Sequence, residues 1–200
     1  MSDVLIAYAT HEGQTARIAA TLAQLLGERG LVPARFDLGV TAPASECVAA
    51  AKALVVAGSV HAGEHQDSLT RFCLAHHDSL NGKPSAFLSV SLSAAGKDDR
   101  NSQRATEQLE HFLDATDWRP TFARSLPGAV RYSTLSAPKR FWMRLLQRTF
   151  GRTMAREGFP DITVDEEFTG SQDLRECADM SAALAQNASQ PATPLASSSG

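Results

Sequence analysis

Apolar residues along this chain occur in two patterns, short continuous runs and blocks in which they recur every three or four positions, and the two patterns alternate. Short apolar runs such as residues 4–9 and 53–58 are typical of strands buried on both faces. Blocks in which apolar residues recur every three or four positions predict amphipathic helices. The patterns predict, in order, strand 4–9, helix 14–26, strand 32–38, helix 46–51, strand 53–58, helix 67–80, strand 85–90, helix 100–116, strand 121–126 and helix 172–186.

This alternation predicts an α/β fold. Strands that alternate with helices form βαβ units, so the sheet should be mostly parallel and covered by helices on both faces. Pro33 lies within the second strand and has no N–H to donate, which places that strand at an edge of the sheet. In open parallel sheets, ligands bind at the carboxyl ends of the strands. The loops after the first, third and fourth strands are therefore the candidate binding elements.

The first of these loops has the features of an anion site. It consists of Thr10, His11, Glu12, Gly13, Gln14 and Thr15. Backbone N–H groups at the start of the following helix favour an anion there, and Gly13 lets the backbone approach it closely. No lysine follows and only one glycine is present, so a phosphate monoester fits better than a triphosphate or a dinucleotide. A capped turn that binds nothing has the same pattern, and the motif alone leaves both interpretations open.

The other two loops are rich in small residues, which leave room for a flat ring system. Their candidate binding residues are Ser59, Val60, His61, Ala62 and Gly63, followed by Ser91, Leu92, Ser93, Ala94, Ala95 and Gly96. His61 and His65 are candidate general bases, because a neutral imidazole accepts a proton near pH 7. A role as plain loop residues is favoured over this one, since the sequence gives no geometry.

Composition limits the class of protein. The chain has 200 residues and a net charge of −3, which suits one domain at 1–187 and gives no sign of a nucleic-acid partner. Its three cysteines are widely separated, so neither a metal site nor a disulfide framework is expected. No apolar run approaches the roughly 20 residues that span a bilayer, and the start lacks a signal-peptide pattern. We therefore expect a cytoplasmic protein with a disordered tail at 188–200.

A basic segment interrupts the βα rhythm at about residues 131–168. Arginines at 140, 144, 148, 152 and 156 fall every fourth residue, Lys139 precedes them, and no acidic residue lies between Lys139 and Arg156. Such a helix, with Trp142 on it, is typical of an amphipathic helix at an anionic membrane surface. The same cations could receive substrate carboxylates, and an ordinary surface helix is the third interpretation.

Several of these segments together resemble the flavodoxin fold, and more closely the menaquinone-dependent protoporphyrinogen dehydrogenases. The resemblance covers about residues 3–187. Its motifs are Thr10-His11-Glu12-Gly13-Gln14-Thr15, Gly58-Ser59-Val60-His61-Ala62-Gly63-Glu64-His65, Lys83-Pro84-Ser85-Ala86-Phe87-Leu88-Ser89-Val90-Ser91-Leu92, Asp117-Trp118-Arg119-Pro120 and Pro127-Gly128-Ala129-Val130-Arg131-Tyr132.

The resemblance implies a five-stranded parallel sheet of order 2-1-3-4-5 with the basic helical insertion after the fifth strand. It implies FMN, with its phosphate on residues 10–15 and its ring system between the loops near 59–63 and 92–96. It also implies oxidation of a reduced tetrapyrrole, protoporphyrinogen IX, by a membrane quinone, at the inner face of the cytoplasmic membrane. The implied substrate or membrane contacts are Arg131, Tyr132, Lys139, Arg140, Trp142, Arg144 and Arg148.

Two stretches, 151–160 and 166–171, depart from the pattern of this family, so the sequence defines the substrate less well than the flavin. His61 and Leu92 stand where many flavodoxins flank the flavin with Trp or Tyr, which reduces the expected stacking energy. Three other functions remain open: a flavodoxin-type electron carrier, an FMN-dependent quinone reductase that uses a nicotinamide donor, and a binding module without flavin. The sequence does not decide whether the chain forms homo-oligomers.

Overall fold

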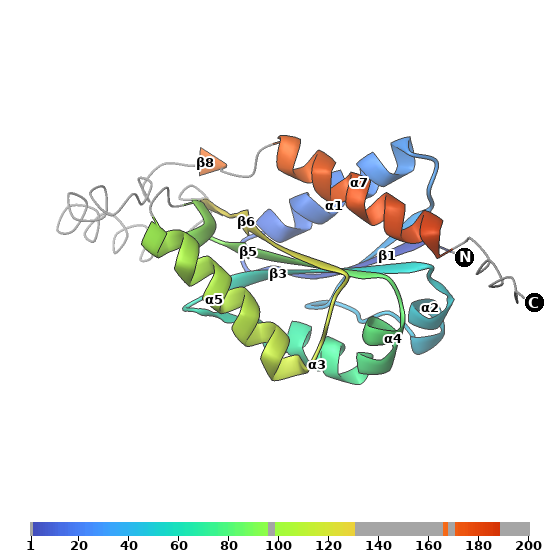
Figure 1. The fold of residues 1–200 in the computed structure, drawn as a ribbon, viewed down its shortest axis with the longest axis horizontal. Coiled ribbons are helices and arrows are strands. Elements are labelled where there is room, and N and C mark those ends of the chain that lie inside the picture. The colour runs from blue at the N-terminus through green and yellow to red at the C-terminus, as the bar shows by residue number, and fades with distance from the viewer. Residues whose placement is uncertain (1, 96–98, 131–165, 168–170, 189–200) are drawn as a thin grey trace, which may run out of the picture.

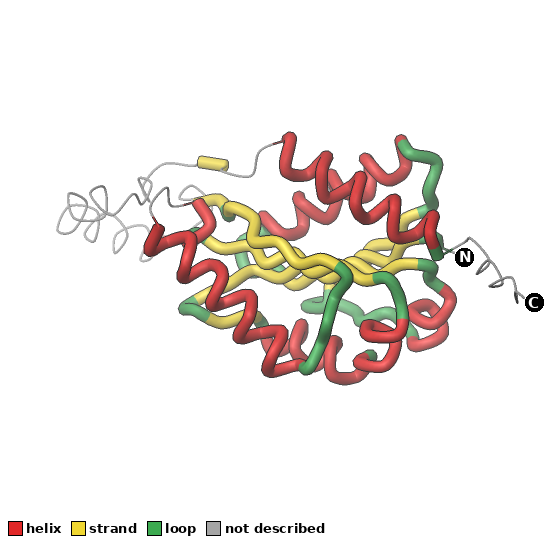
Figure 2. The backbone as a smooth tube through the Cα atoms, viewed as in Figure 1, coloured by secondary structure: helices red, strands yellow, loops and turns green. Residues whose placement is uncertain are grey.

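The computed structural model describes residues 2–95, 99–130, 166–167 and 171–188. A central sheet lies between two layers of helices (Figures 1 and 2), as the alternating pattern predicts. The elements are β1 (Val4–Ala9), α1 (Gln14–Glu28), β2 (Pro33–Asp37), α2 (Ser45–Ala50), β3 (Ala53–His61), β4 (Glu64–His65), α3 (Asp67–Ala75), α4 (His77–Gly82), β5 (Ser85–Ser91), η1 (Ser93–Ala95), α5 (Asp99–Thr116), β6 (Phe122–Pro127), β7 (Ala129–Val130), β8 (Glu166–Glu167) and α7 (Ser171–Asn187).

The sheet has the predicted α/β topology. Five parallel strands lie in the order β2-β1-β3-β5-β6, which is the expected order once the short β4 is set aside. Strand β2, which begins at Pro33, lies at an edge as its proline requires. One strand of this sheet was not predicted: β4 pairs antiparallel with the end of β3 and makes this a six-stranded sheet.

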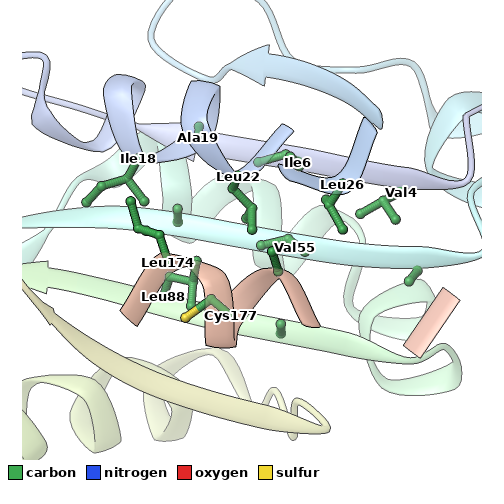
Figure 3. Packing of buried hydrophobic residues seen from close by; sticks show 14 of the residues in the cluster. Val4, Ile6, Ile18, Ala19, Leu22, Leu26, Val55, Leu88, Leu174 and Cys177 are labelled. Atoms are coloured by element: carbon green, nitrogen blue, oxygen red, sulfur yellow. The ribbon is translucent and has the colours of Figure 1, made fainter. Parts of the chain in front are cut away.

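Alternate side chains of each strand point to opposite faces and build two separate cores. On one face Val4, Ile6 and Val55 contact α1 and α7, which lie together on that side of the sheet (Figures 1 and 3). On the other face Leu5 and Val56 belong to a cluster that includes residues of α2, α3, α4 and α5. Helix α7 is thus as necessary as α1, because without it half of one face would be exposed to water.

Two arginines help to hold α7 in place through three ion pairs. Arg124 on β6 reaches Asp173 at 3.1 Å and Glu176 at 2.7 Å, and both carboxylates lie on α7. Arg29, which follows α1, contacts Asp179 of the same helix at 2.6 Å. These partly exposed pairs fix the direction of α7 more than they add to stability.

The bounds of some elements differ from the predicted ones. The strand predicted at 53–58 continues to His61 and turns back as β4, so the predicted polar loop at 59–65 is a β-hairpin. The helix predicted at 67–80 is two helices, with a break at His76 (φ −118°, ψ 23°). Periodicity could not reveal this break, because the buried positions Leu69, Phe72 and Leu80 keep helical spacing across it.

The short strands β7 and β8 pair antiparallel, with Ala129 opposite Glu167 and Val130 opposite Glu166. The predicted basic helix between them lies outside the described residues. So do the expected substrate or membrane contacts Arg131, Tyr132, Lys139, Arg140, Trp142, Arg144 and Arg148, and residues 189–200 of the predicted tail.

The segment 117–120 and the first residues of the segment 83–92, both of which carry the family resemblance, lie at the amino end of the sheet, away from the candidate loops. Trp118 is fully buried and donates from Nε1 to Ser85 Oγ at 3.1 Å, and that hydroxyl donates to the Leu80 carbonyl at 2.8 Å. The Lys83 ammonium donates to the carbonyls of Ala49 and Ala51 at the end of α2, where the helix dipole favours a cation. The structure therefore gives Lys83, Ser85 and Trp118 a structural role.

The buried Trp118–Ser85 hydrogen bond leads to a prediction about stability. Trp118→Phe removes the donor and leaves a small cavity, so we expect the free energy of unfolding to fall by about 1–3 kcal/mol. Urea denaturation followed by circular dichroism measures the change. Arg119→Lys, at an exposed neighbouring position, is the control and should change stability by less than about 0.5 kcal/mol. Equal losses in the two variants would contradict the structural role of the indole.

Candidate functional site

The three candidate loops come together at the carboxyl edge of the sheet. The register aligns the strand ends, with Ala9 beside Gly58 and Ser59 beside Val90. The first two loops touch at their tips, where the rings of His11 and His61 lie 4.9 Å apart between centroids. Loops far apart in the sequence thus lie at one edge of the sheet, as the parallel topology predicts.

The first loop turns at Gly13, which has a left-handed backbone (φ 83°) that other residues rarely adopt. Its N–H donates to Thr10 Oγ1 at 2.9 Å, and its carbonyl accepts the first N–H bond of the helix, from Arg17, at 3.1 Å. The chain therefore enters α1 through a tight turn that leaves the amides at the start of the helix without intrahelical partners. The side chain of Glu12 is exposed.

Thr15, in the first turn of α1, is the unusual residue of this loop. Its side chain is fully buried, and among the described residues nothing forms a hydrogen bond with its Oγ1. Buried polar groups are nearly always paired, and an unpaired one costs about 1–3 kcal/mol. A hydroxyl held this way beside helix N-terminal amides is suited to donate to an anionic ligand such as phosphate.

The second loop is the tight hairpin that joins β3 to β4. Its two central residues, Ala62 (φ 53°) and Gly63 (φ 91°), both have positive φ, as a type I′ turn requires. His61 and Glu64, which pair across the turn, are exposed. The hairpin projects Val60, His61, Ala62 and Gly63 beside the first loop, where the sequence places a ligand flank.

His65, at the base of the hairpin, lies in a very different environment from His61. Its ring packs against Phe112 at 4.6 Å and Phe87 at 5.3 Å between centroids, and its Nε2 lies 3.1 Å from Ser89 Oγ. Burial lowers the pKa of His65 to about 4, because the interior disfavours the charged form. The ring is therefore neutral at pH 7 and faces the core, which favours a structural role over general-base chemistry.

The third loop leaves β5 through a hydroxyl-stabilised turn. Ser91 Oγ accepts the N–H of Ala94 at 3.2 Å and starts the 3₁₀ turn η1. Leu92 is partly exposed. Gly128 lies against this loop: its N–H donates to the Ser91 carbonyl at 2.9 Å, and a Cβ there would lie 3.3 Å from the Ser91 carbonyl carbon. Gly96 lies outside the described residues.

The structure thus brings together the described residues of all three predicted loops. Gly128 is the supporting residue that the predicted site lacks. Its signal in the sequence is the Pro127-Gly128 pair at the end of the last parallel strand, at the same edge of the sheet. Among the described residues, no three His, Cys, Asp or Glu side chains are grouped as metal ligands would be.

Known proteins place this architecture in a family. The flavodoxin domain family matches residues 5–155. The chain belongs to the flavodoxin family. Its solved structural relatives include a short-chain flavodoxin associated with a non-canonical PDU bacterial microcompartment, with a TM-score of 0.52 and 14% identity over 94% of this chain and all of that one. At this identity the match shows the shared fold alone.

Two characterised relatives are more similar in sequence. The protoporphyrinogen IX dehydrogenase [quinone] of Escherichia coli K12 is 30% identical over 148 residues, which cover 74% of this chain and 80% of the relative. The enzyme of the same name from Leishmania major is 28% identical over 181 residues, or 90% of this chain and 74% of the relative. These relatives confirm the resemblance inferred from the motifs and the assignment to the oxidoreductases.

The helices that the structure describes include none with the length and apolar character needed to cross a bilayer.

The positive φ of Gly13 gives a prediction with an internal control. A Cβ at Gly13 would meet no atom within 4 Å, so Gly13→Ala should cost only the backbone strain, about 1 kcal/mol. Gly27, in the same helix, also has open space but an ordinary backbone. Gly27→Ala should therefore stabilise the chain by about 0.5–1 kcal/mol. Thermal unfolding of both variants checks the two signs, and the same sign for both would contradict the left-handed turn at Gly13.

Proposed function

We propose that this chain is an FMN-dependent dehydrogenase that oxidises protoporphyrinogen IX to protoporphyrin IX and passes the electrons to a membrane quinone. The observation that carries the cofactor assignment is the buried, unpartnered hydroxyl of Thr15 at the start of α1. The named function of the Escherichia coli and Leishmania relatives supports the choice of substrate and acceptor.

The residues present fit FMN. The turn at Thr10–Gly13 and the first turn of α1, with Thr15, would hold its phosphate through backbone amides and hydroxyls. The hairpin tip and the loop from Ser91 to Ala95 would flank its ring system. When bound, FMN supplies the two-electron redox chemistry, while the protein positions the cofactor and tunes its potential.

The chain's own groups have separate parts in this proposal. Leu92, which is partly exposed, offers an apolar contact beside the ring site. His61 is the candidate base with solvent access, whereas the neutral ring of His65 faces the core. The polar contacts to the cofactor phosphate would come from backbone amides and from the hydroxyl of Thr15.

The test is a spectrum followed by turnover. The purified full-length chain is examined for flavin absorbance before and after added FMN, and then mixed with protoporphyrinogen IX and a menaquinone analogue. Flavin bands with quinone-dependent porphyrin fluorescence support the proposal. Flavin that bleaches with NADH or NADPH alone would indicate the quinone reductase, a stable semiquinone without turnover would indicate an electron carrier, and a colourless protein would refute the FMN assignment.

The hydroxyl of Thr15 allows a sharper test of the cofactor site. Thr15→Val keeps the shape and removes the hydroxyl, so we expect FMN affinity to fall about 10- to 100-fold, the value of a hydrogen bond to a charged group. The same change removes an unpaired buried group, so the FMN-free protein should be no less stable than the wild type. Thr21→Val, at an exposed site of the same helix, is the control. Flavin fluorescence titration measures affinity, and an unchanged dissociation constant in Thr15→Val would contradict the phosphate assignment.

We further propose that the basic segment brings the protein to anionic membranes, where its quinone is dissolved. The support is the run of uncompensated cations from Lys139 to Arg156. Neutralising Arg140, Arg144 and Arg148 to Gln should weaken sedimentation with anionic vesicles at low salt by about 1 kcal/mol per charge, and added salt should act likewise.

The control for the membrane experiment is a variant that loses the same three positive charges outside the basic segment. The triple variant Arg71→Gln, Arg104→Gln, Arg175→Gln changes three exposed arginines of α3, α5 and α7. If both triple variants lose vesicle binding equally, net charge and not the basic segment is responsible.

A further inference from the structure

The hairpin that flanks the candidate flavin site contacts the first loop through the ring of His61 at its tip and the central strands and α5 through His65 at its base. Its tip, from His61 to Glu64, is exposed, whereas His65 at the base is packed between two strands and a helix. A side chain at this point controls the angle at which the whole hairpin leaves the sheet. We propose that His65 is a positioning residue, whose contact with Ser89 and the two phenylalanine rings fixes the hairpin over the cofactor site and so sets how tightly and in what geometry the flavin is held.

This inference rests on the FMN assignment above and assigns one residue of that site a role. Its first support is the hydrogen-bonding distance of 3.1 Å between His65 Nε2 and Ser89 Oγ. Ser89 is fully buried on β5, the strand next to β3, so the contact joins the hairpin to a rigid central strand. The His65–Ser89 contact joins β4 to β5 and is separate from the pairing of β3 with β4.

The second support is the packing around the ring. Phe87 and Phe112 stack on one another at 4.8 Å, and His65 contacts both, so the imidazole has aromatic neighbours from β5 and from α5. On the opposite strand, a Cβ built on Gly58 would lie 3.0 Å from His65 Cδ2. The ring is thus held between the backbone of β3 and the Phe pair, which leaves the hairpin base little room to shift.

A second hydrogen bond supports the same arrangement next to the candidate flavin loop. Gln66 Nε2 donates to Ser59 Oγ at 3.3 Å, which joins the residue after the hairpin to the residue before it. Together the His65 and Gln66 contacts close the hairpin base on both sides. The exposed tip then has its position set by the base.

The test separates positioning from plain stability by a double variant. His65→Phe keeps an aromatic ring beside the Phe pair but leaves the buried Ser89 hydroxyl unpaired, so stability and positioning are both affected. His65→Phe combined with Ser89→Ala removes both polar partners, which can return stability close to that of the wild type. His111→Phe, at an exposed position of α5, is the matched control.

Three readouts are taken on the full-length chain. They are the dissociation constant for FMN, the visible circular dichroism of bound flavin, and the hydrogen exchange of amides 60–65 in the FMN-free protein. The double variant should bind FMN about three- to tenfold more weakly, the range expected for one neutral hydrogen bond, with an altered visible spectrum and faster exchange at the hairpin. The control should match the wild type.

The outcomes distinguish this inference from the proposed function. If the double variant regains wild-type stability, FMN affinity and visible circular dichroism together, the contact is only structural and the inference is overturned. If the wild type binds no FMN, the proposed function fails, and unchanged hydrogen exchange in the double variant would then overturn the positioning role independently. Weaker FMN binding by a double variant of restored stability supports the positioning role of His65.

Discussion

The parallel strands at the centre of this protein are buried on both faces, and this double burial constrains everything around them. Neither face can be left to water, so the chain must return after the interruption at 131–165 to lay α7 beside α1. The ion pairs of Arg29 and Arg124 with α7 then fix the direction of that return. Since both faces are occupied by helices, the ends of the strands are the remaining places for a ligand.

The two ends of the sheet differ in how completely their polar groups are paired. At the amino end, Trp118 donates to Ser85, and the Ser85 hydroxyl donates to a backbone carbonyl. Lys83 donates to carbonyls at the end of α2. At the carboxyl end, Thr15 keeps a buried hydroxyl that nothing in the described part of the chain pairs. Folding thus pairs the described polar side chains at the amino end and leaves the Thr15 hydroxyl at the other end without a partner among the described residues.

The sequence was sufficient to predict those features of the fold that depend on the residue pattern within one strand or helix. Continuous apolar runs identified the central strands β1 and β3, and Pro33 identified the edge strand, because both follow from backbone and burial rules that act within a few residues. The hairpin was missed since Ser59 and His61 are polar and its turn, Ala62-Gly63, lacks the usual Asn-Gly signal. The burial of His65 was equally invisible, because it depends on Phe112, 47 positions further along the chain.

The open edges of the sheet have a consequence for how copies of this protein meet. An edge strand offers unpaired N–H and C=O groups to any other strand, and this is a common route to aggregation. Pro33 begins β2 and Pro127 ends β6, so each edge strand carries a residue that cannot donate to an added strand. Arg35 and Arg124 add charge along the same two strands. Both edges of this sheet therefore disfavour the addition of a strand from another copy of the chain.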